Sequence, residues 1–222
     1  MAKISNIEEL KSLLKKEILN QNGTITITIN AISEISHTND IVGNCLQEWL
    51  PEWFEDKGLK IIATDKTQEF PDFTAYFDDE VVPIDIKCWN YDNSPAFDIA
   101  NFDSFYNVLY DNPQKLFAQY MTIGYVPTKH GFTIKYTDIK SLAELLGPSR
   151  KYPIGLQVKR ERPYAIRPAN FKKNDYEHFE NLEELIKAVK ATRDMFPLDP
   201  EKEEYTSNQW LERLQSEINN HK

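Results

Sequence analysis

The fold is decided by two neighbouring segments, Phe70-Pro71-Asp72-Phe73 and Val81-Val82-Pro83-Ile84-Asp85-Ile86-Lys87. The first segment is read as the start of a β-strand that an acidic residue, Asp72, opens. The second predicts a buried β-strand, because it is an apolar run interrupted only by Asp85 and Lys87. Successive side chains of a strand point to opposite faces, so Asp85 and Lys87 should share one face while Ile84 and Ile86 share the other. The segments therefore predict a hairpin that carries two carboxylates and one ammonium group.

This set of charged groups suits the hydrolysis of a phosphodiester. Magnesium binds proteins through one or two carboxylates and fills its other positions with phosphate oxygens and water. We expect Asp72 and Asp85 to be the metal ligands, and Lys87 to orient the attacking water or to stabilise the developing negative charge. The alternative interpretation of Asp85 and Lys87 is an ordinary ion pair on an exposed strand face.

Length and composition indicate a globular chain. With 222 residues, 41% of them hydrophobic, the chain can bury a sizeable core and is expected to form one domain over residues 1–222. The sequence has neither a long apolar run nor a signal-peptide core, so we expect a cytoplasmic protein without a membrane partner. Cys45 and Cys88 lack metal-site spacing and are expected to be reduced and structural.

Helical and strand patterns alternate along the chain. Apolar spacing predicts helices over residues 7–19, 40–56, 181–195 and 207–218, and the alternating segment 24–29 predicts a strand with one buried face. Interleaved helices and strands predict an α/β or mixed α+β fold, with a central mixed sheet flanked by helices.

The charge is distributed unevenly. The net charge is −9, yet the segment 150–173 carries +7, which leaves −16 for the remainder. Its single acid is Glu161, and its eight basic residues are Arg150, Lys151, Lys159, Arg160, Arg162, Arg167, Lys172 and Lys173. A basic stripe on an acidic body favours a polyanion bound in a cleft, and a solvated charged face is the alternative.

Pro71-Asp72 followed by Asp85-Ile86-Lys87 resembles the motif of the PD-(D/E)xK nucleases, and more narrowly that of the EcoRV-like type II restriction endonucleases. Further segments are similar in the same order: Ser104-Phe105, Gln119-Tyr120, Ile123-Gly124-Tyr125-Val126 and Leu156-Gln157. The similarity extends, with gaps, over residues 38–195.

The resemblance implies a restriction-endonuclease-like fold with a five-stranded type of central sheet. It also implies a homodimer that binds double-stranded DNA and uses Mg²⁺, or Mn²⁺ in its place, to leave 5′-phosphate and 3′-hydroxyl ends. A cognate DNA methyltransferase is expected in the same host. Residues 1–36 are the expected dimerisation element, because the alternating strand 24–29 needs a pairing partner. A DNA repair or junction-resolving nuclease of the same fold, and a DNA-binding protein without catalysis, are the alternatives.

The resemblance further implies a glutamate on the helix that precedes the motif, close to the metal. Glu48 is the candidate for this catalytic and metal-binding role, Glu52 is its rival, and a solvent-facing glutamate is the alternative.

The segment 159–174 takes the position of the family's DNA-recognition loop. Arginine and asparagine carry paired hydrogen-bonding groups that can read base edges, so Arg162, Arg167 and Asn170 are the expected base contacts. The expected phosphate contacts are Lys159, Arg160, Lys172 and Lys173. Gln68, in the loop before the hairpin, matches a segment that approaches the minor groove.

Overall fold

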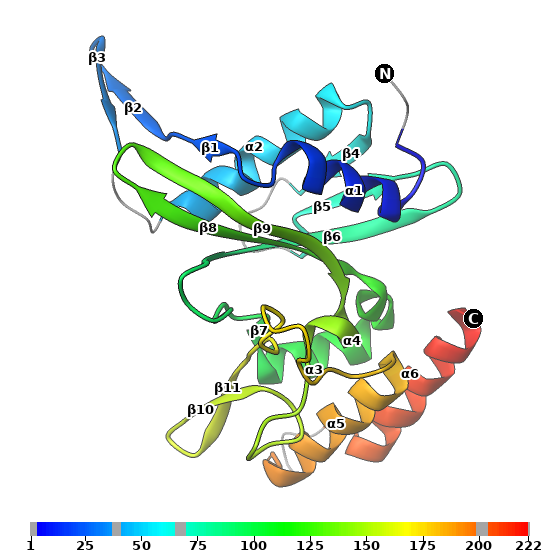
Figure 1. Cartoon of the computed structure of the whole chain (residues 1–222). Helices are drawn as coiled ribbons and strands as arrows, with labels where there is room; N and C mark the ends of the chain where they lie inside the picture. Colours follow the sequence, from blue (N-terminus) through cyan, green and yellow to red (C-terminus); the bar gives the residue numbers. More distant parts are fainter. Residues whose placement is uncertain (1–3, 37–40, 65–69, 199–203, 222) are drawn as a thin grey trace. The chain divides into compact units, whose positions relative to one another are not determined.

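The structure, a computed structural model, describes residues 4–36, 41–64, 70–198 and 204–221, and the chain divides into two compact units (Figure 1). Unit 1 comprises Met1–Ser94 and Ala118–Lys140, and unit 2 comprises Pro95–Phe117 and Ser141–Lys222. The expected single domain over 1–222 stays a prediction, since the compactness of each unit does not decide whether the two unfold together. No helix in the described ranges combines the length and apolar composition needed to span a bilayer.

Unit 1 is built on a six-stranded sheet with the order β1-β9-β8-β6-β5-β4. Its central strands β6 and β8 run parallel, whereas β5 is antiparallel to both β4 and β6. The mixed sheet that the sequence predicts is therefore confirmed, with six strands in place of five. The strands are β1 (Asn22–Gly23), β4 (Lys60–Ala63), β5 (Phe73–Tyr76), β6 (Val81–Asn90), β8 (Gln119–Thr128) and β9 (Gly131–Ser141).

Two helices, α1 (Ile7–Glu17) and α2 (Val42–Asp56), pack on one face of this sheet. The side chain of Asn6 caps α1 by accepting a hydrogen bond from the Glu9 amide. Every fourth residue of α2 from Val42 to Phe54 is buried, in a core shared with the strands, and the helix continues through Pro51. Thr38 and Asn39, whose side chains suit a helix cap and which shortly precede α2 in the sequence, lie outside the described residues.

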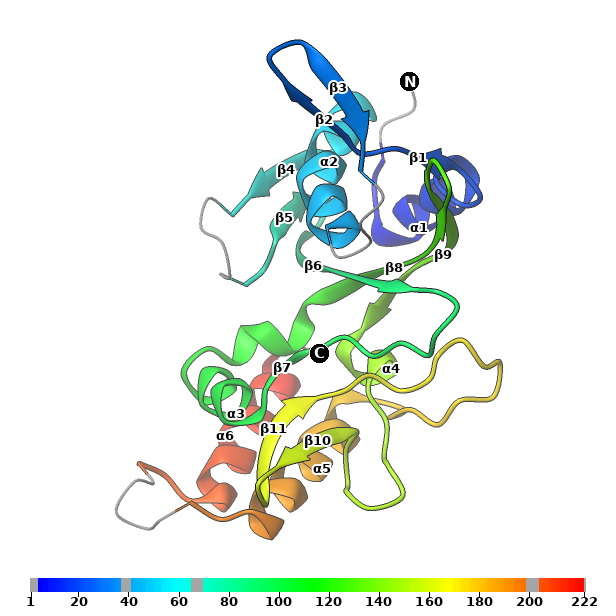
Figure 2. The ribbon, with the colours of Figure 1, turned by 90° about the vertical axis from the view of Figure 1, so that its left-hand side faces the viewer.

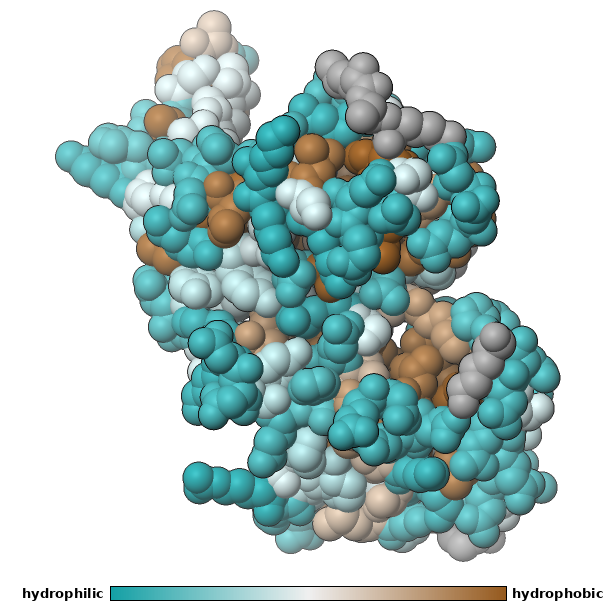
Figure 3. Space-filling view, turned by 45° about the vertical axis from the view of Figure 1, so that its right-hand side comes forward, coloured by the Kyte–Doolittle hydropathy of each residue, from teal (hydrophilic) through white to brown (hydrophobic). Residues whose placement is uncertain are grey.

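A separate hairpin, β2 (Thr26–Ile29) and β3 (Ile32–Ile35), extends beyond the sheet (Figures 1 and 2). The pairing of Ile29 with Ile32 and of Ile27 with Glu34 places three isoleucines on one hairpin face. Ile27, Ile29 and Ile32 are 52%, 66% and 75% exposed, and Figure 3 shows hydrophobic atoms on this projection. The prediction of one buried face for 24–29 is therefore wrong for the described hairpin, because β2 and β3 pair only with each other.

Unit 2 combines a small sheet with helices. Its strands have the order β10-β11-β7, namely β10 (Leu156–Lys159), β11 (Arg162–Ile166) and β7 (Ala100–Asn101). Its helices are α3 (Phe102–Asp111), a short 3-10 turn (Pro113–Phe117), α4 (Leu142–Leu145), α5 (Leu182–Met195) and α6 (Ser207–His221). The helices expected over 181–195 and 207–218 are thus confirmed as α5 and α6.

A buried arginine joins the helices of unit 2. Arg193 of α5 is 2% exposed, and its guanidinium lies 2.6 Å from Asp103 Oδ1 and 4.5 Å from the centre of the Tyr106 ring, both on α3. Trp210 of α6 stacks on Tyr106 and donates a hydrogen bond to the Tyr106 carbonyl oxygen. A buried guanidinium requires such a carboxylate partner, and here the pair fixes α3 against α5.

Candidate active site

The hairpin of β5 and β6 brings Asp72 beside β6. Phe73 pairs with Ile84 and Thr74 with Pro83, so Asp72 stands at the point where the two strands separate. The Asp72 Oδ2 atom accepts a hydrogen bond from the Ile86 amide at 2.5 Å. The backbone of β6 therefore fixes the orientation of the first carboxylate.

Asp85 and Lys87 lie on the same face of β6, with 2.8 Å between Lys87 Nζ and Asp85 Oδ2. Ile84 and Ile86 point to the opposite face and are buried under the helices of unit 1. Because Asp85 itself is only 6% exposed, an ordinary ion pair on an exposed strand face does not describe it.

The electrostatics of this hairpin favour a bound cation. Burial raises the pKa of the Asp85 carboxyl; Lys87 opposes this effect, Asp72 adds to it, and the net shift is upward. Burial, with a contribution from Asp85, also raises the pKa of Tyr120, which pairs with Asp85 across β6 and β8. The upward shift thus comes mainly from burial, and the formal charges of Asp72, Asp85 and Lys87 sum to −1, which a divalent cation would compensate.

The donor set fits a hard divalent ion with an open coordination shell. Within the described residues, no three side chains of His, Cys, Asp or Glu come together as a metal site. The protein would thus supply two carboxylates, Asp72 and Asp85, and leave the remaining positions to water and phosphate oxygens, as Mg²⁺ prefers. Cys88 follows Lys87, and burial and Asp72 raise its pKa to about 12, which keeps the thiol protonated and inert at neutral pH.

The helix glutamate that the resemblance implies stays a prediction, and the described part of α2 places a different side chain against Asp72. Glu48 and Glu52 are both exposed, and the α2 side chain that contacts Asp72 is Gln47. Gln47 Nε2 lies 3.3 Å from Asp72 Oδ2 and 3.3 Å from the carbonyl oxygen of Ile86.

Helix phase explains this difference. Gly43 and Gln47 are four residues apart and form one stripe of α2, and a Cβ atom at Gly43 would lie 3.4 Å from Cys88 Cβ of β6. One step along a helix turns the side chain by about 100°, so Glu48 leaves this stripe. The sequence does hold a weak signal for Gln47, because this polar residue lies next to the apolar positions Leu46 and Leu50. The signal identifies Gln47 as a site residue only when the packing of α2 on the sheet is known.

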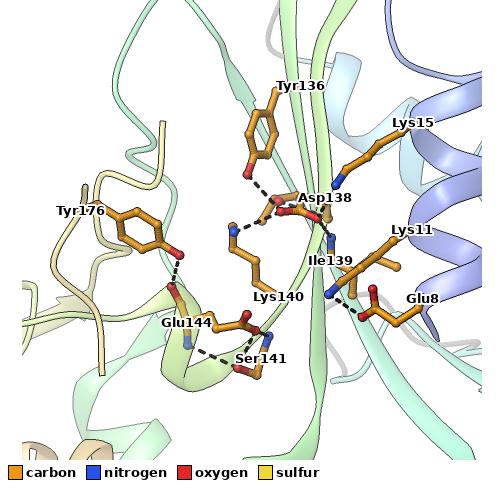
Figure 4. Close-up of polar contacts among 11 residues, drawn as sticks. Glu8, Lys11, Lys15, Tyr136, Asp138, Ile139, Lys140, Ser141, Glu144 and Tyr176 are labelled. Atoms are coloured by element: carbon orange, nitrogen blue, oxygen red, sulfur yellow. Dashed lines mark hydrogen bonds and ion pairs between the residues drawn. The ribbon is translucent and has the colours of Figure 1, made fainter. Parts of the chain in front are cut away.

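The tripeptide Asp-Ile-Lys occurs a second time, at Asp138-Ile139-Lys140 of β9. Figure 4 shows the Asp138 carboxylate between Lys140, 3.1 Å away, and Lys15 of α1, 3.5 Å away. Burial alone would raise the pKa of the Asp138 carboxyl. The two lysines and the Ile139 amide lower it by more, so the net pKa lies below its ordinary value. The carboxylate is thus satisfied by groups of the protein and joins α1 to β9, which distinguishes it from Asp85.

The predicted recognition segment contains a second hairpin, formed by β10 and β11 in unit 2. Its two-residue turn consists of Arg160 and Glu161, whose φ angles of 50° and 61° belong to the left-handed region. Lys159, Arg160 and Arg162 are exposed at this tip, and the Lys159 ammonium lies 3.5 Å from the centre of the Tyr164 ring. The hairpin therefore presents three cations to solvent.

Arg167 is engaged inside unit 2. Its guanidinium lies 3.0 Å from Asp98 Oδ1, donates to Gln157 Oε1 at 3.0 Å and also contacts the Ala96 carbonyl oxygen. These contacts tie the segment before β7 to β10, and the role of Arg167 as a base contact stays a prediction.

The other expected DNA contacts differ in exposure. Asn170 and Lys172 are half-buried, Lys173 is exposed, and Gln68 lies outside the described residues. The structure thus brings Asp72, Asp85 and Lys87 together in unit 1 and collects three of the expected DNA contacts at one hairpin tip in unit 2.

Comparison with known proteins gives consistent matches over most of the chain. A family model described as NgoBV restriction endonuclease matches residues 4–222. The type II restriction enzyme NlaIV of Neisseria lactamica is 30% identical over 187 residues, which cover 82% of this chain and 77% of that protein. The type II restriction enzyme NgoBV of Neisseria gonorrhoeae is 28% identical over 152 residues, or 68% of this chain and 86% of that protein.

A solved structure, named NlaIV restriction endonuclease, superimposes with a TM-score of 0.83 at 26% sequence identity. The match covers 100% of this chain and 91% of the solved chain. The mixed α/β architecture is therefore shared along the whole chain.

Proposed function

The chain belongs to the NgoBV restriction endonuclease family, and from this premise we propose that it is a type II restriction endonuclease, which hydrolyses both strands of duplex DNA at a specific sequence. The observation that carries the proposal is the contact of Lys87 with the buried Asp85 beside Asp72, in a chain whose relatives bear this activity in their names. The same hairpin supports a place for the chain within the PD-(D/E)xK superfamily, near its EcoRV-like members.

In the proposed mechanism, Asp72 and Asp85 would hold Mg²⁺, for which Mn²⁺ could substitute. The bound ion would activate water and neutralise charge on the phosphate. Lys87 remains beside Asp85, where its ammonium orients the attacking water and stabilises the negative charge that develops on the phosphate oxygens. Cleavage at the 3′-oxygen then leaves 5′-phosphate and 3′-hydroxyl ends.

Digestion of a plasmid of known sequence tests this function. With Mg²⁺ we expect a fixed set of fragments on a gel, and with EDTA we expect intact plasmid, because two carboxylates and one lysine lack the positive charge that the reaction needs. Excess Mg²⁺ or Mn²⁺ added after EDTA should restore the same fragments.

The alternatives give different gels. Nicks or cuts that follow DNA structure without discrete fragments would favour a repair or junction-resolving nuclease, and DNA retention without any cleavage would favour a binding protein. Because a host must protect its own copies of the target sequence, a cognate DNA methyltransferase is part of the proposal.

We further propose that the protein is a homodimer in which the β2–β3 hairpin contacts a second copy. An isolated two-stranded hairpin is marginally stable in water, and this one exposes three isoleucines on a single face. A stable interface buries about 800 Å² on each partner, so neighbouring surface must contribute beside the hairpin.

Replacement of Ile29 and Ile32 by serine tests the interface. Both side chains are exposed, so the monomer should keep its fold while sedimentation at micromolar concentration shifts from dimer to monomer. Thr28→Ala, on the other face of the hairpin, is the matched control and should stay dimeric. A wild-type protein that sediments as a monomer without DNA would contradict the proposal.

A further inference from the structure

Within the described part of α2, the side chain of Gln47 contacts both Asp72, the residue just before β5, and Ile86 of β6. Its Nε2 atom lies 3.3 Å and 3.5 Å from the two Asp72 carboxylate oxygens and 3.3 Å from the Ile86 carbonyl oxygen. All three neighbours are acceptors only, so the amide must turn its NH₂ group toward them. A glutamate at this position could not donate these hydrogen bonds.

The neutral side chain also limits the charge of the site. Asp72, Asp85 and Lys87 together carry one net negative charge when all are ionised, and Gln47 adds none. A single Mg²⁺ is held through one or two carboxylates, whereas paired ions bridge additional ligands. We infer that Gln47 is a positioning residue, which orients the Asp72 carboxylate and the Ile86 carbonyl for one divalent ion per chain.

The packing of α2 accounts for this role. Gly43, one turn before Gln47, lets the helix approach Cys88, and the amide of Gln47 therefore reaches the strands directly. Asp72 has a second donor, the Ile86 amide. The inference rests on the proposed function, since it assigns a role at the same metal site.

Manganese binding to the free protein provides a test that does not depend on cleavage. In electron paramagnetic resonance at room temperature only free Mn²⁺ gives a sharp signal, so the bound ion can be counted. We expect one ion per chain in the wild type, and Gln47→Met, which keeps the length but not the donors, should weaken Mn²⁺ affinity by about 10–100-fold. Asn44→Ala, an exposed position of the same helix, is the matched control and should bind as the wild type does.

Kinetics separate positioning from a general loss of structure. In single-turnover cleavage with saturating DNA, Gln47→Met should raise the half-saturating Mg²⁺ concentration by a similar factor, while DNA affinity without metal and the thermal unfolding temperature stay unchanged.

Two further variants distinguish the possible failures. Wild-type Mn²⁺ affinity in Gln47→Met, or two ions per wild-type chain, would overturn the inference, and a loss of binding in Glu48→Gln instead would return the role to that glutamate. Asp85→Asn should abolish Mn²⁺ binding whether or not Gln47 positions Asp72, because Asp85 is a ligand in the proposed metal site. If it does not, the metal site of the proposed function itself is wrong.

Discussion

Replacement of Asp85 or Lys87 by alanine is expected to lower the rate of DNA cleavage by at least about a thousandfold. Asp85→Ala removes one of two carboxylates that can hold the metal, and Lys87→Ala removes the ammonium that lies 2.8 Å from it. Neither side chain belongs to the exposed basic hairpin, so specific DNA binding, measured by gel shift in Ca²⁺, should be largely retained. The ratio of cleavage to binding is thus the quantity to measure.

The second Asp-Ile-Lys tripeptide provides a control matched in sequence. Lys140→Met removes the same charge from the same motif on β9, but its partner Asp138 also has Lys15, so cleavage per folded protein should stay near wild type. Retained cleavage in both Asp85→Ala and Lys87→Ala would reject the proposed active site. Loss of cleavage in Lys140→Met, with the fold intact, would instead assign chemistry to β9.

The arrangement of the β5–β6 hairpin could be predicted from sequence because each of its signals is local. Alternation in a strand determines which side chains share a face, and the short separation of Asp72 from Asp85 leaves room only for a turn between paired strands. The two Asp-Ile-Lys tripeptides show the limit of such reasoning: they are identical in sequence, but Asp85 and Asp138 differ in burial and in the charges that the fold brings to them.

The parts that sequence did not determine depend on docking between distant elements. Glu48 and Gln47 are adjacent on α2, and only the packing of Gly43 against Cys88 decides which of them faces the hairpin. In the same way Arg167 is indistinguishable from Arg162 in sequence, yet the approach of Asp98 and Gln157 occupies its guanidinium. A buried partner far away in the sequence gives no local signal.

Alanine at Lys159, Arg160 and Arg162 together is expected to weaken specific DNA binding at least about a hundredfold, because these side chains form the exposed tip of the β10–β11 hairpin. A two-stranded ribbon fits the major groove, where arginine can read guanine. Arg162→Ala alone should cost about 1–3 kcal/mol and relax specificity at one position. Lys159→Ala or Arg160→Ala should weaken binding to all sequences alike.

Salt dependence separates the two kinds of contact. Each lost phosphate contact should reduce the slope of log affinity against log salt concentration by about 0.9, so the triple variant should lose roughly two such increments if Lys159 and Arg160 contact phosphates. Lys187→Ala, an exposed lysine of α5, is the matched control and should leave the slope unchanged. An equal reduction of this slope in Lys187→Ala would show that the hairpin contributes only to the overall positive charge and makes no specific phosphate contacts. An unchanged affinity in the triple variant would place the DNA contacts elsewhere on the chain.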